Sequence, residues 1–212
     1  MPVKAKSIIF DLDGTLIDSA PSILAGFKHV LKTNGIEPLV PLTSSVIGPP
    51  LIPTLMMLGG LNDETKLLHM AEQFKDFYDL EACLLSQPYD AVDDGLKKLR
   101  EVGFELHIAT NKRYTPTRNI LKYLGWDGLF TSVYTLDKDG ASFNSKSVMI
   151  ESQLKHFGLS ADQAIYVGDR VEDMEAAQKN QLNFIGVSWG YGEFPESVTL
   201  IESFDQLDSL IE

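Results

Sequence analysis

The stretch that decides how this chain is organised is Ile8-Ile-Phe-Asp-Leu-Asp-Gly-Thr15. Its first three residues are β-branched or aromatic, which is typical of a short buried strand. Two aspartates and a glycine then end the apolar run, so polar chemistry begins where the strand stops. We therefore expect a buried N-terminal strand that delivers Asp11 and Asp13 to one edge of a sheet.

Helical and strand patterns alternate through the second half of the chain. The expected elements are a helix over 92–102, a strand over 104–109, a helix with Thr115 as N-cap and Pro116 at its first position, a weak strand over 133–135, a helix over 145–157, a strand over 164–167, a helix over 172–179 and a strand over 183–187. Such alternation favours right-handed crossovers and a parallel sheet with helices on both faces. The predicted fold class is α/β, with a three-layer Rossmann-like core.

Residues 17–85 interrupt this alternation. Only helical patterns occur there, over 20–33, 50–58 and 62–80. Because the segment follows the first strand and precedes the regular series, we interpret it as an inserted α-helical cap domain. The predicted core then comprises residues 1–16 and 86–212.

Composition excludes several classes of protein. At 212 residues, and roughly 150 per domain, the chain fits one domain with an insertion. The formal net charge of 18 − 30 = −12 argues against binding to nucleic acid or to an anionic membrane. A single cysteine, Cys83, excludes an intrachain disulfide. No signal-peptide core or membrane-spanning window is apparent, so we expect a cytoplasmic protein.

Polar residues follow the predicted strands, where parallel α/β sheets bind their ligands. These residues are Asp11 and Asp13 after the first strand, Thr110, Asn111 and Lys112 after the second, Lys146 at the start of the helix after the weak strand, and Asp169 and Asp173 after the fourth. Clustered carboxylates repel one another, and Mg²⁺ is the usual cation that compensates them. A lysine and a hydroxyl beside such a cluster indicate a phosphoryl site, so phosphoryl transfer is the predicted reaction class.

Four motifs carry a family resemblance. In order, they are Phe10-Asp-Leu-Asp-Gly-Thr-Leu16, Thr110-Asn111, Lys146 and Gly168-Asp-Arg-Val-Glu-Asp173. Together they resemble the motifs of the haloacid dehalogenase-like hydrolase superfamily. The helical insertion lies where that superfamily has its first type of cap, and Ile185-Gly-Val-Ser-Trp-Gly-Tyr-Gly192 resembles a segment of the phosphoglycolate phosphatase-like branch.

The resemblance implies a role for each matching residue. The implied catalytic residues are Asp11 as nucleophile, Asp13 as general acid and base, Thr110 and Lys146. The implied substrate-binding residues are Gly14, Thr110, Asn111, Lys146 and Arg113. The implied Mg²⁺ ligands are Asp11, Asp13 through its main-chain carbonyl, Asp169, and Asp173 directly or through water.

The predicted function is Mg²⁺-dependent hydrolysis of a small phosphomonoester through an aspartyl-phosphate, with phosphoglycolate the first substrate to test. All four arginines lie outside the predicted cap, so a neutral leaving group such as a sugar or nucleoside is equally reasonable. The alternatives are β-phosphoglucomutase-like transfer, pyrophosphate hydrolysis and a non-catalytic phosphometabolite-binding module. The expected partner is a small phosphorylated metabolite, and the expected state is monomer or homodimer.

Each motif taken alone has a simpler interpretation. The first is compatible with a tight turn, and Thr110-Asn111 with a helix cap. Lys146 is compatible with a solvated surface lysine, and Asp173 with a residue that favours the positive end of a helix. Only the ordered set favours the catalytic interpretation.

Overall fold

The computed structural model describes residues 5–137 and 143–211, and the chain divides into two compact units. One unit combines Met1–Asp18 with Pro88–Glu212, and the other comprises Ser19–Gln87. The helical insertion was expected over residues 17–85, and each of its two boundaries lies two residues later in the structure. Within the described residues, no helix is long and apolar enough to cross a membrane.

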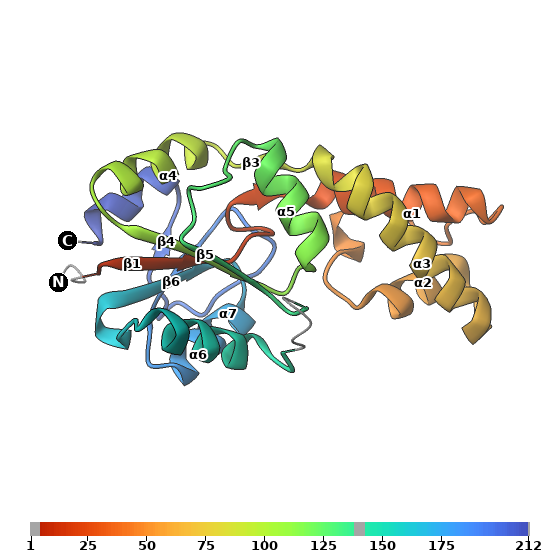
Figure 1. Cartoon of the computed structure of the whole chain (residues 1–212). Coiled ribbons are helices and arrows are strands. Elements are labelled where there is room, and N and C mark those ends of the chain that lie inside the picture. Colours follow the sequence, from red (N-terminus) through yellow and green to blue (C-terminus); the bar gives the residue numbers. More distant parts are fainter. Residues whose placement is uncertain (1–4, 138–142, 212) are drawn as a thin grey trace. The chain divides into compact units, whose positions relative to one another are not determined.

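The larger unit is built on a six-stranded sheet (Figure 1). Its strands, in spatial order, are β5 (Ser132–Thr135), β4 (Glu105–Thr110), β1 (Ser7–Phe10), β6 (Ala164–Gly168), β7 (Asn183–Val187) and β8 (Leu200–Ile201). All neighbouring strands run parallel. Two further short strands, β2 (Ile17–Asp18) and β3 (Gln87–Pro88), pair separately. The three two-residue strands have no counterpart in the sequence prediction, because two residues are too few to establish a period.

Helices cover both faces of this sheet. They are α4 (Val92–Glu101), α5 (Tyr114–Tyr123), α6 (Lys146–Phe157) and α7 (Val171–Lys179). Figure 1 places α4 and α5 on one face and α6 and α7 on the other. The predicted α/β fold with a parallel sheet between two helical layers is therefore confirmed. Strand β1 is buried along its whole length, as its apolar sequence requires.

One predicted helix start is wrong. Helix α5 begins at Tyr114 with Arg113 as N-cap, whereas the sequence pattern favoured Thr115 and Pro116. The carbonyl of Arg113 accepts the N–H of Thr117 at 3.2 Å, so the helix begins two residues before the proline. The N–H of Tyr114 donates to Asp137 Oδ1 at 2.7 Å, so a residue from beyond β5 stabilises the helix end.

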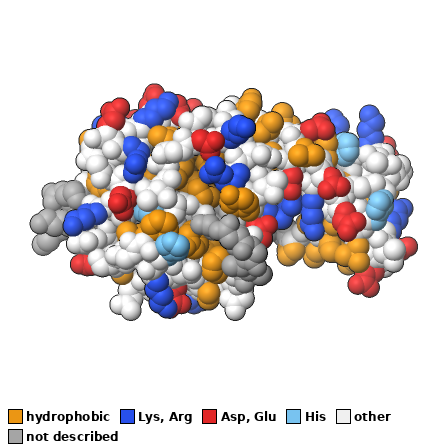
Figure 2. All heavy atoms as spheres, viewed as in Figure 1, with side chains coloured by type: hydrophobic (Ala, Val, Ile, Leu, Met, Phe, Trp, Pro, Cys, Tyr) orange, Lys and Arg blue, Asp and Glu red, His pale blue; other side chains and the backbone are white. Residues whose placement is uncertain are grey.

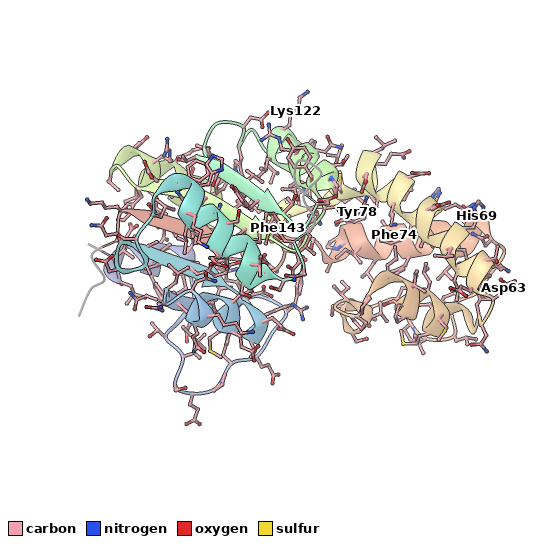
Figure 3. The ribbon with its side chains drawn as sticks, turned by 60° about the horizontal axis from the view of Figure 1, so that its bottom comes forward. Asp63, His69, Phe74, Tyr78, Lys122 and Phe143 are labelled. Carbon is pink, nitrogen blue, oxygen red and sulfur yellow. The ribbon has the colours of Figure 1, made fainter. Side chains whose placement is uncertain are left out.

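The smaller unit is helical. Its elements are α1 (Ala20–Thr33), the 3₁₀ turn η1 (Ser44–Val46), α2 (Leu51–Gly59), α3 (Glu64–Leu80) and the 3₁₀ turn η2 (Ala82–Leu85). Phe74 and Tyr78 project from α3 (Figure 3), and the Phe74 ring lies 5.0 Å from that of Phe27 on α1. A Cβ on Gly26 of α1 would lie 2.5 Å from Phe74, so only glycine permits this approach of the two helices.

The surface carries the excess of acidic residues. On the face drawn in Figure 2, Asp and Glu side chains are interspersed with Lys and Arg side chains. Some form exposed pairs one helical turn apart, such as Lys97 with Asp93 and Lys155 with Glu151, each at 2.6 Å. Exposed pairs of this kind are screened by solvent and contribute little to stability, so the stability of the fold depends mainly on its buried core.

Candidate active site

Three neighbouring strands bring polar residues to the same edge of the sheet. Asp11 follows β1, Thr110 ends β4, and Asp169 follows β6. Because β1 pairs with β4 on one side and β6 on the other, Asp11 lies between the other two. All three side chains are buried. The strand order thus explains how residues far apart in sequence come together.

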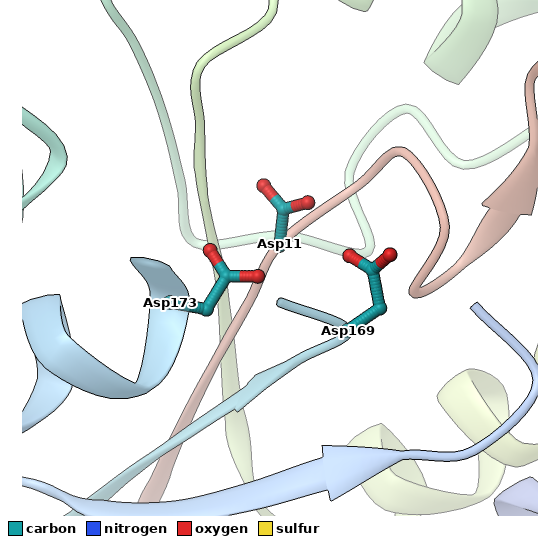
Figure 4. Close-up of side chains that lie close together, drawn as sticks. All are labelled: Asp11, Asp169 and Asp173. Atoms are coloured by element: carbon teal, nitrogen blue, oxygen red, sulfur yellow. The ribbon is translucent and has the colours of Figure 1, made fainter. Parts of the chain in front are cut away.

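Asp11, Asp169 and Asp173 form an acidic cluster (Figure 4). One carboxylate oxygen from each lies within 4.8 Å of the others. Burial raises the pKa of Asp11 to about 7, although Lys146 opposes the shift, and the carboxylates of Asp173 and Asp169 raise it further. Burial also raises the pKa of Asp169 to about 6. The three carboxylates repel one another, and a hard cation that prefers oxygen ligands would relieve that repulsion. The donor set therefore fits Mg²⁺.

Lys146 joins two of these carboxylates. Its Nζ lies 2.8 Å from Asp11 Oδ1, and it also donates a hydrogen bond to Asp173 Oδ1. Burial opposes its charge, but the two aspartates outweigh that effect and hold the pKa of Lys146 well above its ordinary value. The lysine occupies the first position of α6, directly after the N-cap Ser145. It is therefore a buried, charged partner of Asp11 and not a solvated surface lysine.

Asp173 has two donors in the structure. Besides Lys146, the backbone N–H of Arg170 donates to Asp173 Oδ2 at 3.1 Å. The residue stands in the first turn of α7, where a carboxylate stabilises the exposed N–H groups and the helix dipole. Its helix-capping role and its place in the acidic cluster therefore occur together.

The loop after β1 turns sharply against Asp169. Gly14 has a φ of +83°, and a Cβ there would lie 2.3 Å from Asp169 Oδ2. Thr15 Oγ1 lies 3.4 Å from Asp169 Oδ1. Glycine is thus required at position 14 both by its backbone conformation and by the approach of the carboxylate.

Asp13 does not join the acidic cluster through its side chain. Its carboxylate is held by Lys112, whose Nζ lies 2.9 Å from Oδ1 and 3.2 Å from Oδ2. The backbone N–H of Lys112 also donates to Thr110 Oγ1 at 3.2 Å. From the sequence, Lys112 is expected at this edge of the sheet, but the motifs assign it no role. The sequence feature that could have assigned Lys112 to the site is its position directly after Thr110-Asn111.

The segment Trp189–Gly192 also contacts the site. The N–H of Tyr191 donates to Asp169 Oδ2 at 2.8 Å, and Trp189 Nε1 donates to the carbonyl of Thr15 at 3.1 Å. A Cβ on Gly190 would lie 2.2 Å from Asp169 Cβ, so the segment packs directly on that aspartate. The sequence identified this segment by resemblance only. Its hydrogen bonds to Asp169 and Thr15 join residues that are 22 and 174 positions apart in the sequence.

The remaining candidate residues, Asn111 and Arg113, are less buried than the acidic cluster. Asn111 is exposed and, with Lys146, Ser147 and Glu172, lines a hollow of about 350 Å³. Arg113 is the N-cap of α5 and is partly buried. The substrate-binding roles of Asn111 and Arg113 stay predictions.

The fold and the cluster define an α/β enzyme whose site lies at the carboxyl edge of a parallel sheet. The family model of the haloacid dehalogenase-like hydrolases matches residues 8–187, and the chain belongs to that family.

Relatives with known names agree with this assignment. The chain is 30% identical over 191 residues to a 5'-nucleotidase of Pseudomonas aeruginosa, covering 90% of this chain and 86% of the relative. It is 27% identical over 217 residues to a phosphoglycolate phosphatase of Psychrobacter arcticus, covering 97% and 94%. The structure of a predicted phosphoglycolate phosphatase from Haemophilus somnus superposes with a TM-score of 0.85 at 25% identity, covering 97% of each chain. The expected family and its phosphoglycolate phosphatase-like branch are confirmed, and the chain is a phosphatase of this family.

Proposed function

We propose that the protein hydrolyses a small phosphomonoester through a phosphorylated Asp11. The observation that carries this proposal is the buried carboxylate of Asp11 beside the ammonium of Lys146, at 2.8 Å, in a cluster with Asp169 and Asp173. A buried carboxylate held by a cation at a strand end is suited to act as a nucleophile.

In the first step, an oxygen of Asp11 attacks phosphorus and the bond from phosphorus to the leaving oxygen breaks. Lys146 neutralises charge on Asp11 and on the phosphoryl oxygens, and the hydroxyl of Thr110 donates to one of them. In the protonated form that this step requires, one oxygen of Asp13 gives its proton to the leaving oxygen, which departs as an alcohol, while the other oxygen can keep the hydrogen bond from Lys112. Asp13 is then a carboxylate.

In the second step, the Asp13 carboxylate takes a proton from water as the water oxygen attacks phosphorus. The bond from phosphorus to Asp11 breaks, and phosphate and the Asp11 carboxylate are released. Asp13 is protonated again, so the cycle closes.

The oxygen donors expected to hold Mg²⁺ are Asp11, Asp169, the main-chain carbonyl of Asp13, and Asp173 directly or through water. When bound, this ion would supply positive charge to the phosphoryl oxygens. Thr15 and Tyr191 support the arrangement by donating to the two oxygens of Asp169, at 3.4 and 2.8 Å.

The proposed substrate class is small phosphomonoesters. Both the 5'-nucleotidase and the phosphoglycolate phosphatase relatives support it by their names, and these names differ in the alcohol that leaves. We propose phosphoglycolate as the first substrate to test, with nucleoside and sugar phosphates beside it. We also propose that the helical unit Ser19–Gln87 is the cap that the family resemblance implies.

The test is release of phosphate, with and without Mg²⁺, from phosphoglycolate, sugar phosphates, nucleoside monophosphates and pyrophosphate. Asp11→Asn is the inactive control, and circular dichroism checks that it folds. Mg²⁺-dependent turnover that disappears in Asp11→Asn supports the proposal and ranks the substrates. An isomerised sugar phosphate without net phosphate release would instead support mutase chemistry. Tight binding of the esters without turnover would contradict the hydrolytic function.

A further inference from the structure

Lys112 contacts two residues of the proposed reaction. They are Asp13, which transfers the proton, and Thr110, which binds the phosphoryl group. Its ammonium lies 2.9 and 3.2 Å from the two carboxylate oxygens of Asp13. Its backbone N–H donates to the hydroxyl oxygen of Thr110 at 3.2 Å. The hydroxyl of Thr110 accepts that hydrogen bond, so its own proton remains to be donated.

The ion pair is well placed to fix a side chain. The side chain of Lys112 is only 7% exposed, whereas that of Asp13 is 25% exposed. A buried ammonium that contacts both oxygens of a partly exposed carboxylate restricts the torsion angles of that carboxylate. The two residues are 99 positions apart, so the pair also joins the loop after β1 to the end of β4.

We propose that Lys112 is a positioning residue that holds Asp13 in the orientation needed for proton transfer to the leaving oxygen. This inference rests on the proposed function, and it adds a residue to which neither the motifs nor the family resemblance gave a role. Lys112 acts through Asp13, and the reacting atoms themselves are contacted by other groups.

This role predicts a dependence on the leaving group. An alkyl phosphate needs a proton on its departing oxygen, whereas p-nitrophenolate leaves as a stable anion. The ratio kcat/KM reports the steps up to the first irreversible one, which is phosphorylation of Asp11 when the alcohol leaves irreversibly. Loss of Lys112 should therefore lower kcat/KM for alkyl phosphates much more than for p-nitrophenyl phosphate.

The experiment measures kcat/KM for the best alkyl phosphate of the panel and for p-nitrophenyl phosphate in four full-length proteins. They are the wild type, Lys112→Met, Lys112→Arg and the control Lys155→Met, which removes an exposed lysine paired with Glu151. We expect Lys112→Met to lose about 10²-fold on the alkyl phosphate and less than about 3-fold on p-nitrophenyl phosphate. Lys112→Arg should restore most of the loss, and Lys155→Met should match the wild type.

A second comparison tests whether the lysine acts through Asp13. In an Asp13→Asn background, Lys112→Met should change kcat/KM by less than about 2-fold, because the group it positions is already absent. Thermal melting verifies folding, and Lys112→Gln replaces Lys112→Met if the latter does not fold.

Three results would overturn the inference. Equal losses on the two substrates would indicate general damage to the site. A further large loss in the Asp13→Asn background would indicate that Lys112 contacts the substrate itself. A wild type that hydrolyses no ester would refute the proposed function, and this inference with it, whereas the first two results leave the hydrolytic function intact.

Discussion

The Nζ atom of Lys146 lies 2.8 Å from Oδ1 of Asp11, and both side chains are only 8% exposed. The two residues are 135 positions apart, and the same ammonium also bonds Asp173. Removing one partner of a buried ion pair leaves an uncompensated charge, which costs about 3–5 kcal/mol. The pair therefore links the proposed chemistry to the stability of the fold.

Lys146→Met should consequently lower both the stability of the fold and the activity. We expect the free energy of unfolding at neutral pH to fall by about 3–5 kcal/mol and turnover to fall by at least about 10³-fold. The double variant Lys146→Met with Asp11→Asn should regain part of the stability and none of the activity, because one unpaired carboxylate is gone. Urea denaturation of both variants is the measurement. Equal stability of Lys146→Met and the wild type would argue against a structural ion pair.

Gly14 should not tolerate a side chain. In Gly14→Ala the new Cβ would overlap Asp169 Oδ2, and the backbone φ of +83° adds strain. We expect a loss of about 3 kcal/mol or more in stability and of at least about 10²-fold in activity. Gly158→Ala is the matched control, since its φ is +63° and nothing lies within 4 Å of a Cβ there. That control should lose only about 1 kcal/mol. Similar losses in the two variants would show that the contact with Asp169 is unimportant.

Mg²⁺ should stabilise the folded protein. A ligand that binds only the folded state adds about 2.7 kcal/mol at 100 times its Kd, so the melting temperature should rise with Mg²⁺ and return after chelation. Asp169→Asn should reduce Mg²⁺ affinity in isothermal titration calorimetry, whereas Asp162→Asn, an exposed aspartate outside the cluster, should not. Unchanged affinity in Asp169→Asn would remove this residue from the proposed ligand set.

His107 should make the fold sensitive to acid. Its ring is buried in β4, with Nδ1 2.8 Å from Ser132 Oγ, and burial, aided by Arg100, lowers the pKa of His107 to about 4. The unfolded chain takes up this proton near pH 6.5, so the contribution to stability is full above that pH and is lost as pH falls toward 4. The difference corresponds to about 3 kcal/mol.

The measurement is the free energy of unfolding from pH 7 to pH 4. His107→Gln should have a shallower slope than the wild type over this interval, whatever its stability at pH 7. His69→Gln, which changes an exposed histidine of α3, should keep the wild-type slope. A slope in His107→Gln that matches the wild type would assign the acid sensitivity to other groups.

Local patterns in the sequence predicted much of this protein. The run of apolar residues before Asp11 identified β1 because a strand buried on both faces needs continuous hydrophobicity. Helix α1 was predicted at its observed bounds, since its apolar face repeats with the helical period. The ordered motifs predicted the family, which the match to the family model over residues 8–187 confirms.

Contacts across the sheet were decided by the tertiary structure. The strand order puts β1 between β4 and β6, and only then do Asp11, Lys146, Asp169 and Asp173 meet. The start of α5 depends on Asp137, and the orientation of Asp13 depends on Lys112, both distant in sequence. Hydrophobic periodicity is a property of neighbouring residues, so the sequence by itself determined the elements and the kinds of reactive group. The distances between those groups, and the pKa values that follow from their burial, exist only after the strands have packed.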